Sequence, residues 1–127
     1  MFGHNYSSPQ MKSMKFSGRI NRIHEPDIDH IVEYSDRRLH GDRRVYIESK
    51  FTIRSLNQRT VNQLTNALRM AKSGDVVILN LARRATAREL KALKKRVGPR
   101  RIKKIQVVHK QSDLFNLVKS TFEKELQ

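Results

Sequence analysis

The chain has 127 residues, which is enough for one hydrophobic core but leaves two independent domains too small. It has no cysteine, which excludes disulfides, thiol catalysis and cysteine-ligated zinc, and no apolar run approaches the ~20 residues that cross a bilayer. Its 27 lysines and arginines and 12 acids give a net charge of +15. A net charge of about 2 to 8 is enough to keep a small domain soluble. We expect an intracellular protein, cytoplasmic or nucleoid-associated, with a polyanionic partner.

The first residues are predicted to be a flexible tail. Residues 1–14 combine Gly, Ser, Asn and Pro without apolar periodicity, so they cannot bury enough surface to offset the entropy of ordering. A single domain is expected over residues 15–127, because the apolar patterning begins there and continues to the last residues.

An antiparallel meander is expected next. Alternating apolar and polar side chains predict three strands, over residues 15–23, 28–35 and 45–53. The segment 36–44 has two Asp-Arg-Arg triplets around a Gly-Asp pair, which is typical of a hairpin tip. If Asp36 pairs near Arg44, then Tyr34 faces Tyr46 across the hairpin.

The rest of the chain is predicted to alternate helices and strands. Helices are expected over residues 59–72, 86–97 and 112–122, and strands over 76–79 and 102–109. The run 76–79 is apolar throughout, as in a central strand that helices cover on both faces. Thr86 and Glu89 form a capping-box signature, and the helix that they open is expected to bury Ala87, Leu90, Leu93 and Val97. The predicted fold is α/β leaning towards α+β: an N-terminal antiparallel β-meander, then α-β-α-β-α, in a layered sandwich with a mixed sheet.

The positive charge is concentrated in one stretch. From Arg83 to Lys110 the chain has twelve lysines and arginines and a single acid, Glu89, so this stretch holds +11 of the total. Crowded like charges repel one another, and binding a polyanion relieves that repulsion while releasing counterions. Nucleic acid is therefore the expected partner, and a solvated face kept for solubility is the alternative.

Phosphate contacts are expected from two places in this stretch. Arg83 and Arg84 follow a buried strand and precede a helix, where backbone N–H groups favour an anion. Lys91, Lys94 and Lys95 recur on one helical face and form a ridge that can follow a phosphate backbone. The full set of expected nucleic-acid-binding residues is Arg37, Arg38, Arg43, Arg44, Arg83, Arg84, Arg88, Lys91, Lys94, Lys95, Arg100, Arg101, Lys103 and Lys104.

Recognition is expected to depend on the phosphate backbone, with weak sequence preference and no catalysis. The sequence lacks a groove-reading or RNP-type motif, and RNA is favoured over DNA because a strand face with tyrosine and cations can hold unpaired bases. Tyr46 and Tyr34 are the candidates for base stacking, with a core position as the alternative for Tyr34. No cofactor, resident metal or membrane contact is expected, and the sequence leaves a homodimer and membership of a ribonucleoprotein particle open.

An enzymatic alternative comes from a second pattern. Pro26-Asp27 and Glu48-Ser49-Lys50 resemble the sparse signature of the restriction-endonuclease-like superfamily. That resemblance implies a magnesium-dependent nuclease in which Asp27 and Glu48 hold the metal and Lys50 helps to position the attacking water. A cross-strand charge ladder is the structural alternative for Glu48 and Lys50.

A third class is a regulatory domain that binds other proteins. The expected order from Arg44 to Phe122 is strand, helix, strand, helix, strand, helix, which resembles STAS-type domains. The resemblance places Thr86 near their phosphoacceptor position and implies a protein partner. The cations around it, Arg83, Arg84 and Arg88, depart from that pattern.

Overall fold

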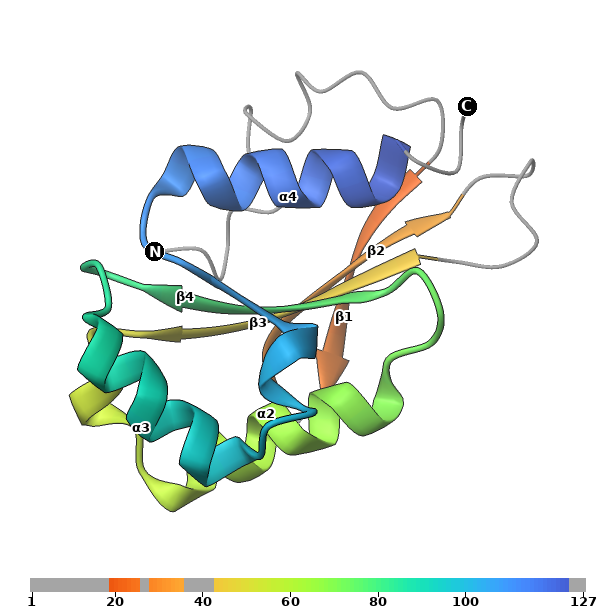
Figure 1. Ribbon diagram of the computed structural model, residues 1–127. Coiled ribbons are helices and arrows are strands. Elements are labelled where there is room, and N and C mark those ends of the chain that lie inside the picture. The colour runs from red at the N-terminus through yellow and green to blue at the C-terminus, as the bar shows by residue number, and fades with distance from the viewer. Residues whose placement is uncertain (1–18, 26–27, 36–42, 124–127) are drawn as a thin grey trace.

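A computed structural model of the protein describes residues 19–25, 28–35 and 43–123 (Figure 1). The predicted tail over residues 1–14 and most of the predicted hairpin tip lie outside these ranges.

The described residues form a five-stranded mixed sheet with strand order β1-β2-β3-β4-β5. The strands are β1 (Arg19–Glu25), β2 (Ile28–Ser35), β3 (Arg43–Lys50), β4 (Val76–Leu81) and β5 (Ile105–Val108). β1 to β3 form an antiparallel meander, whereas β3, β4 and β5 run parallel and are joined by helical crossovers. The fold is thus the predicted layered α/β arrangement with a mixed sheet.

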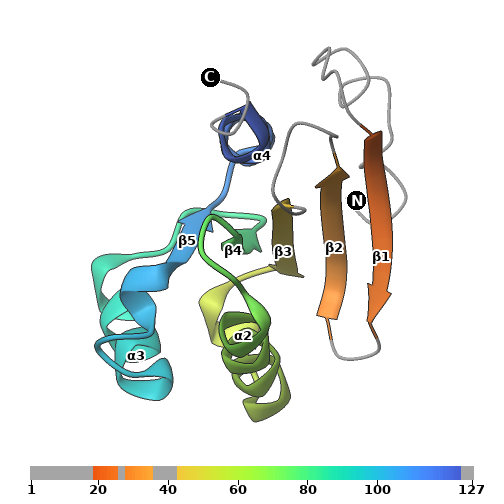
Figure 2. The same cartoon turned by 90° about the vertical axis from the view of Figure 1, so that its right-hand side faces the viewer.

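Helices cover both faces of this sheet. α2 (Gln58–Met70) and α3 (Ala87–Val97) lie on one face, and α4 (Gln111–Glu123) lies on the other (Figures 1 and 2). Each face has its own apolar core, with Leu64 and Leu93 against the first and Val118 and Phe122 against the second. β4 is buried on both faces, as predicted from its uninterrupted apolar run.

β3 is shorter than its sequence pattern predicts. It ends at Lys50, and Ile53–Ser55 form a 3-10 turn, η1, because the chain must leave the sheet here to cross over to α2. Ile53 consequently packs into the core beneath α2 and α3, although its place in the alternation put it on the face of Val45. Phe51, which the alternation placed on the same face as the buried Val45, is 70% exposed.

The last predicted strand is also shorter. Residues Ile102–Lys104 form a second 3-10 turn, η2, so β5 starts only at Ile105. The amide of Ile102 donates to the carbonyl of Gly98, which folds this turn back against the end of α3. α2, by contrast, begins close to its predicted start, at Gln58, because the side chain of Asn57 accepts the amide of Thr60 and caps the helix.

The predicted pairing of Tyr34 with Tyr46 is wrong. In the observed register Tyr34 pairs with Arg43, and Tyr46 pairs with Ile31. The two rings therefore lie in the two different cores, where Tyr34 stacks on Phe122 with ring centroids 5.3 Å apart.

One arginine ties the start of β3 to the loop between α2 and β4. The guanidinium of Arg43 donates to the carbonyl of Ser73 and lies over Gly74, whose φ of 91° favours glycine. A Cβ at Gly74 would collide with this guanidinium. Gly98, with φ 106°, is a matched control because a Cβ there would meet nothing within 4 Å.

We predict that Gly74→Ala costs more stability in the wild type than in an Arg43→Ala background. In the wild type the new Cβ displaces Arg43 and its hydrogen bond, which adds about 1 kcal/mol to the backbone cost of the substitution. Urea unfolding measures the free energies. In the Arg43→Ala background the extra cost of Gly74→Ala should disappear, whereas the cost of Gly98→Ala should be the same in both backgrounds. An unchanged cost of Gly74→Ala would contradict the contact.

Candidate nucleic-acid interface

The helix α3, which carries five of the twelve cations of the basic stretch, starts with the predicted capping box. The side chain of Thr86 accepts the amide of Glu89 at 3.1 Å, and the carboxylate of Glu89 accepts the amide of Thr86 at 3.0 Å. This reciprocal pair satisfies two backbone donors of the first turn and places a negative charge at the positive end of the helix dipole.

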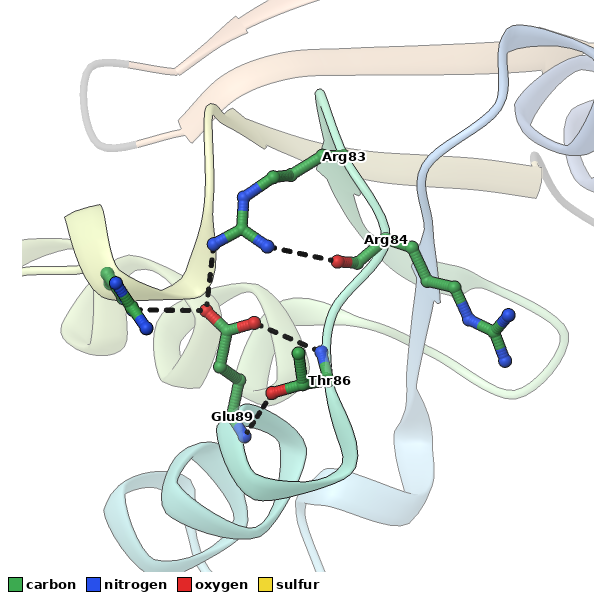
Figure 3. Close-up of polar contacts among 5 residues, drawn as sticks. Arg83, Arg84, Thr86 and Glu89 are labelled. Carbon is green, nitrogen blue, oxygen red and sulfur yellow. Dashed lines mark hydrogen bonds and ion pairs between the residues drawn. The ribbon is translucent and has the colours of Figure 1, made fainter.

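Two arginines from other segments meet the same carboxylate. The Glu89 Oε2 atom lies 3.4 Å from Arg83 Nη2 and 3.9 Å from Arg54 Nε (Figure 3). The pKa of Glu89 is lowered, chiefly because its charged form accepts the backbone amide of Thr86, with Arg83 and Arg54 adding attraction. The acid of the basic stretch is thereby kept ionised and mostly buried.

This arrangement changes the role expected of Arg83. Its guanidinium is directed to Glu89 and to the carbonyl of Arg84, so the protein's own carboxylate takes the place predicted for a phosphate. Arg84 points away from Glu89 in Figure 3 and is exposed. The predicted phosphate contact at this crevice is therefore retained for Arg84 alone.

α3 turns one face to the core and its basic face to solvent. Leu93 and Val97 are buried, whereas the expected inward positions Ala87 and Leu90 are exposed. Those two predictions are wrong because Glu89, a third side chain of the first turn, occupies the inward position there. The cations of the opposite face are all exposed: Arg88, Lys91, Lys94 and Lys95.

Further cations follow on the segment after α3. Arg100, Arg101, Lys103 and Lys104 are exposed on the turn that leads through η2 into β5, and Figure 2 shows this turn beside α3. Arg96 is different, because it donates to the carbonyl of Leu56 at 2.7 Å and braces α3 against the segment before α2.

Arg43 and Arg44 of the predicted hairpin cluster make contacts within the protein and do not extend freely into solvent. Arg44 pairs with Glu33 at 2.7 Å across the β2–β3 ladder, and the hydrogen bond to Glu33 raises the pKa of Arg44. Arg43 is held by Ser73. Arg37 and Arg38 lie outside the described residues. Of this cluster, therefore, Arg43 and Arg44 do not present freely directed guanidinium groups.

Neither predicted stacking residue is accessible. Tyr34 is 0% exposed and Tyr46 is 1% exposed, so no base can lie against either ring. The core alternative is correct for Tyr34, and it holds for Tyr46 as well.

The residues of the nuclease alternative are only partly described. Glu48 is 1% exposed on the sheet face that α2 and α3 cover, Lys50 is half-buried two residues on, and Asp27 lies outside the described ranges. In the part of the chain that is described, no group of three His, Cys, Asp or Glu side chains is arranged to hold a metal ion.

Sequence reasoning missed two residues at the end of β3. Phe51 is exposed, and Arg54, with 83% of its side chain exposed, reaches the Glu89 carboxylate. Their exposure follows from the early end of β3, which the apolar alternation through Ile53 concealed. The contact between Arg54 and Glu89 could not be predicted either, because the two residues are 35 positions apart in the sequence.

Comparison with models of protein families, with curated proteins and with solved structures finds no match to this chain. Across the residues with described structure, none of the helices combines the length and apolarity needed to cross a bilayer.

We predict that Glu89 makes stability dependent on acid pH. Its pKa is lower in the folded chain than unfolded, so its stabilising effect is complete above its usual pKa of 4.5 and is lost as pH falls through the folded value. The matched variant Glu89→Gln keeps a side chain that can cap the helix but does not titrate.

Chemical unfolding of both proteins from pH 7 down to about pH 3 tests this prediction. The wild type should be the more stable at pH 7, and its advantage should shrink below pH 4.5. An advantage that does not change with pH would contradict the role of the Glu89 charge.

Proposed function

We propose that this protein binds nucleic acid through phosphates, with RNA favoured over DNA and with weak sequence preference. The residues assigned to contact it, called here the α3 basic surface, are Arg84, Arg88, Lys91, Lys94, Lys95, Arg100, Arg101, Lys103 and Lys104. The observation that carries the proposal is an asymmetry of burial. Every cation from Arg83 to Lys110 is exposed, whereas the single carboxylate of that stretch is 8% exposed.

This asymmetry has an electrostatic cost. Arg88 and Lys91, Lys91 and Lys94, and Lys91 and Lys95 are three or four residues apart on one helix, where like charges destabilise by a few tenths of a kcal/mol per pair. Exposed carboxylates at these spacings would remove the cost, and the stretch has none. A bound polyanion relieves the repulsion and releases its own condensed counterions.

The dimensions of the surface suit a sugar-phosphate backbone. Arg88 and Lys95 are seven residues apart on α3, which corresponds to about 10 Å along the helix axis. One strand of a duplex has a phosphate every ~3.4 Å of its axis, so this ridge faces about three phosphates. The loop cations lengthen the path beyond the end of the helix.

The preference for RNA no longer depends on a tyrosine face, because Tyr34 and Tyr46 are buried. It depends instead on Phe51, an exposed aromatic side chain, because proteins that recognise RNA commonly stack unpaired bases on aromatic rings. Contacts to phosphates alone carry no sequence information, which accounts for the weak sequence preference.

We predict a steep loss of affinity with salt. The logarithm of the association constant should fall linearly with the logarithm of salt concentration, with a slope of about −0.7 per phosphate on a single strand and −0.9 on a duplex. Titration of a fluorescent oligonucleotide with nucleic-acid-free protein between 50 and 300 mM salt, a range of ~6-fold, measures it. A flat response would contradict phosphate binding.

We predict that reversing three charges on α3 removes much of this binding. Lys91→Glu, Lys94→Glu and Lys95→Glu together should lower the salt slope by about 2 to 3 and weaken all sequences alike. The matched control reverses three other exposed cations, Arg59 and Arg69 of α2 and Lys72 of the loop that follows it, which changes the net charge equally. Equal losses in the two variants would contradict a local surface and indicate an effect of total charge.

A further inference from the structure

The described part of the chain exposes three large apolar side chains, and one of them is aromatic. Phe51 is 70% exposed, compared with 38% for both Met70 and Leu90. Phe51 directly follows β3, at the sheet edge where β3 and β4 end. A ring held at that edge offers a flat apolar surface to solvent.

The position of Phe51 is fixed by β4. The amide of Ala82 donates to the carbonyls of both Lys50 and Phe51, each at 3.1 Å, so the Phe51 backbone is held beside the residues that follow β4. Arg83 and Arg84 come next in the chain. The ring therefore projects from an anchored segment rather than from a free loop.

The segment that carries Phe51 is connected to the basic helix through Glu89. Arg54 lies three residues after Phe51, and both Arg54 and Arg83 meet the carboxylate of Glu89. That shared contact ties the Phe51 segment to the start of α3, where the α3 basic surface begins with Arg84 and Arg88. An aromatic face next to a path for phosphates is the combination that single-strand-binding proteins use.

We infer that Phe51 is a platform on which an unpaired base stacks, so that the protein prefers single-stranded to double-stranded nucleic acid. The inference rests on the proposed function and names the substrate class for it. In a duplex, both faces of a base are covered by its neighbours, whereas an unpaired base leaves a face that can lie on the Phe51 ring. Phosphates on either side of that base then reach Arg84 and the cations of α3.

The test compares a single-stranded 12-nucleotide oligouridine with a 12-base-pair RNA duplex of mixed sequence, two probes of about the same length. Phe51→Ala should weaken binding of the single strand by roughly 5- to 100-fold and leave the duplex within about 2-fold. Phe51→Leu, which stays apolar but loses the aromatic face, should behave like Phe51→Ala. Leu90→Ala on the basic helix and Met70→Ala on α2 are matched controls that should bind both probes as the wild type does.

Phe51→Trp adds a spectroscopic readout, because the chain has no tryptophan. This variant should keep single-strand affinity, and its fluorescence should be quenched by the oligouridine but not by the duplex. Circular dichroism checks that each variant is folded, and truncating a side chain that is 70% exposed should leave stability nearly unchanged.

The outcomes separate this inference from the proposed function. If the wild type binds neither probe, the proposed function fails and the inference fails with it. If the wild type binds and Phe51→Ala retains full affinity for the single strand, the stacking role is overturned while phosphate binding stands. A self-association in sedimentation that Phe51→Ala abolishes would also overturn it, since the ring would then cover a second copy of this chain.

Discussion

The buried position of Glu89 is the constraint on which the basic part of the molecule depends. Twelve cations lie between Arg83 and Lys110, and Glu89 is the single acid among them. Its carboxylate stabilises the first turn of α3 by accepting the amide of Thr86 and by attracting two arginines from different segments. The first turn of α3 is thus fixed against η1 and the end of β4.

The same interaction organises the surface. Because the carboxylate is turned inward, the outer side of α3 and the turn after it present cations with no acid from their own stretch. Arg83 and Arg96 are used to hold α3 in place, through Glu89 and through the carbonyl of Leu56. Structural and ligand-binding cations are therefore distinguished by their contacts and not by their spacing in the sequence.

Much of the fold could be predicted from the sequence because its signals are local. The capping box at Thr86, the apolar run of β4 and the order of the elements all depend on residues close together in the chain. The end of β3 and the start of β5 could not be predicted, because the crossover to α2 and the turn at η2 replace strand residues that the apolar pattern had included.

The candidate site was less predictable because its side chains are positioned by residues distant in the sequence. Arg43 and Arg44 look like free cations in the sequence, yet partners about thirty and eleven residues away, Ser73 and Glu33, hold them. Tyr34 and Tyr46 are drawn into the two cores by packing against α4 and α2, while Phe51 is left outside. Such long-range contacts cannot be predicted from the hydrophobic periodicity of the sequence, which reports local structure.

The central claim is that the α3 basic surface is where a polyanion binds, and lysine footprinting tests it directly. The protein is acetylated briefly with and without a single-stranded RNA oligonucleotide, and the modification of each lysine is measured by mass spectrometry. The account predicts protection of Lys91, Lys94, Lys95, Lys103 and Lys104, and none of Lys72 on the loop after α2. Protection spread evenly over all lysines, or absent from α3, would contradict it.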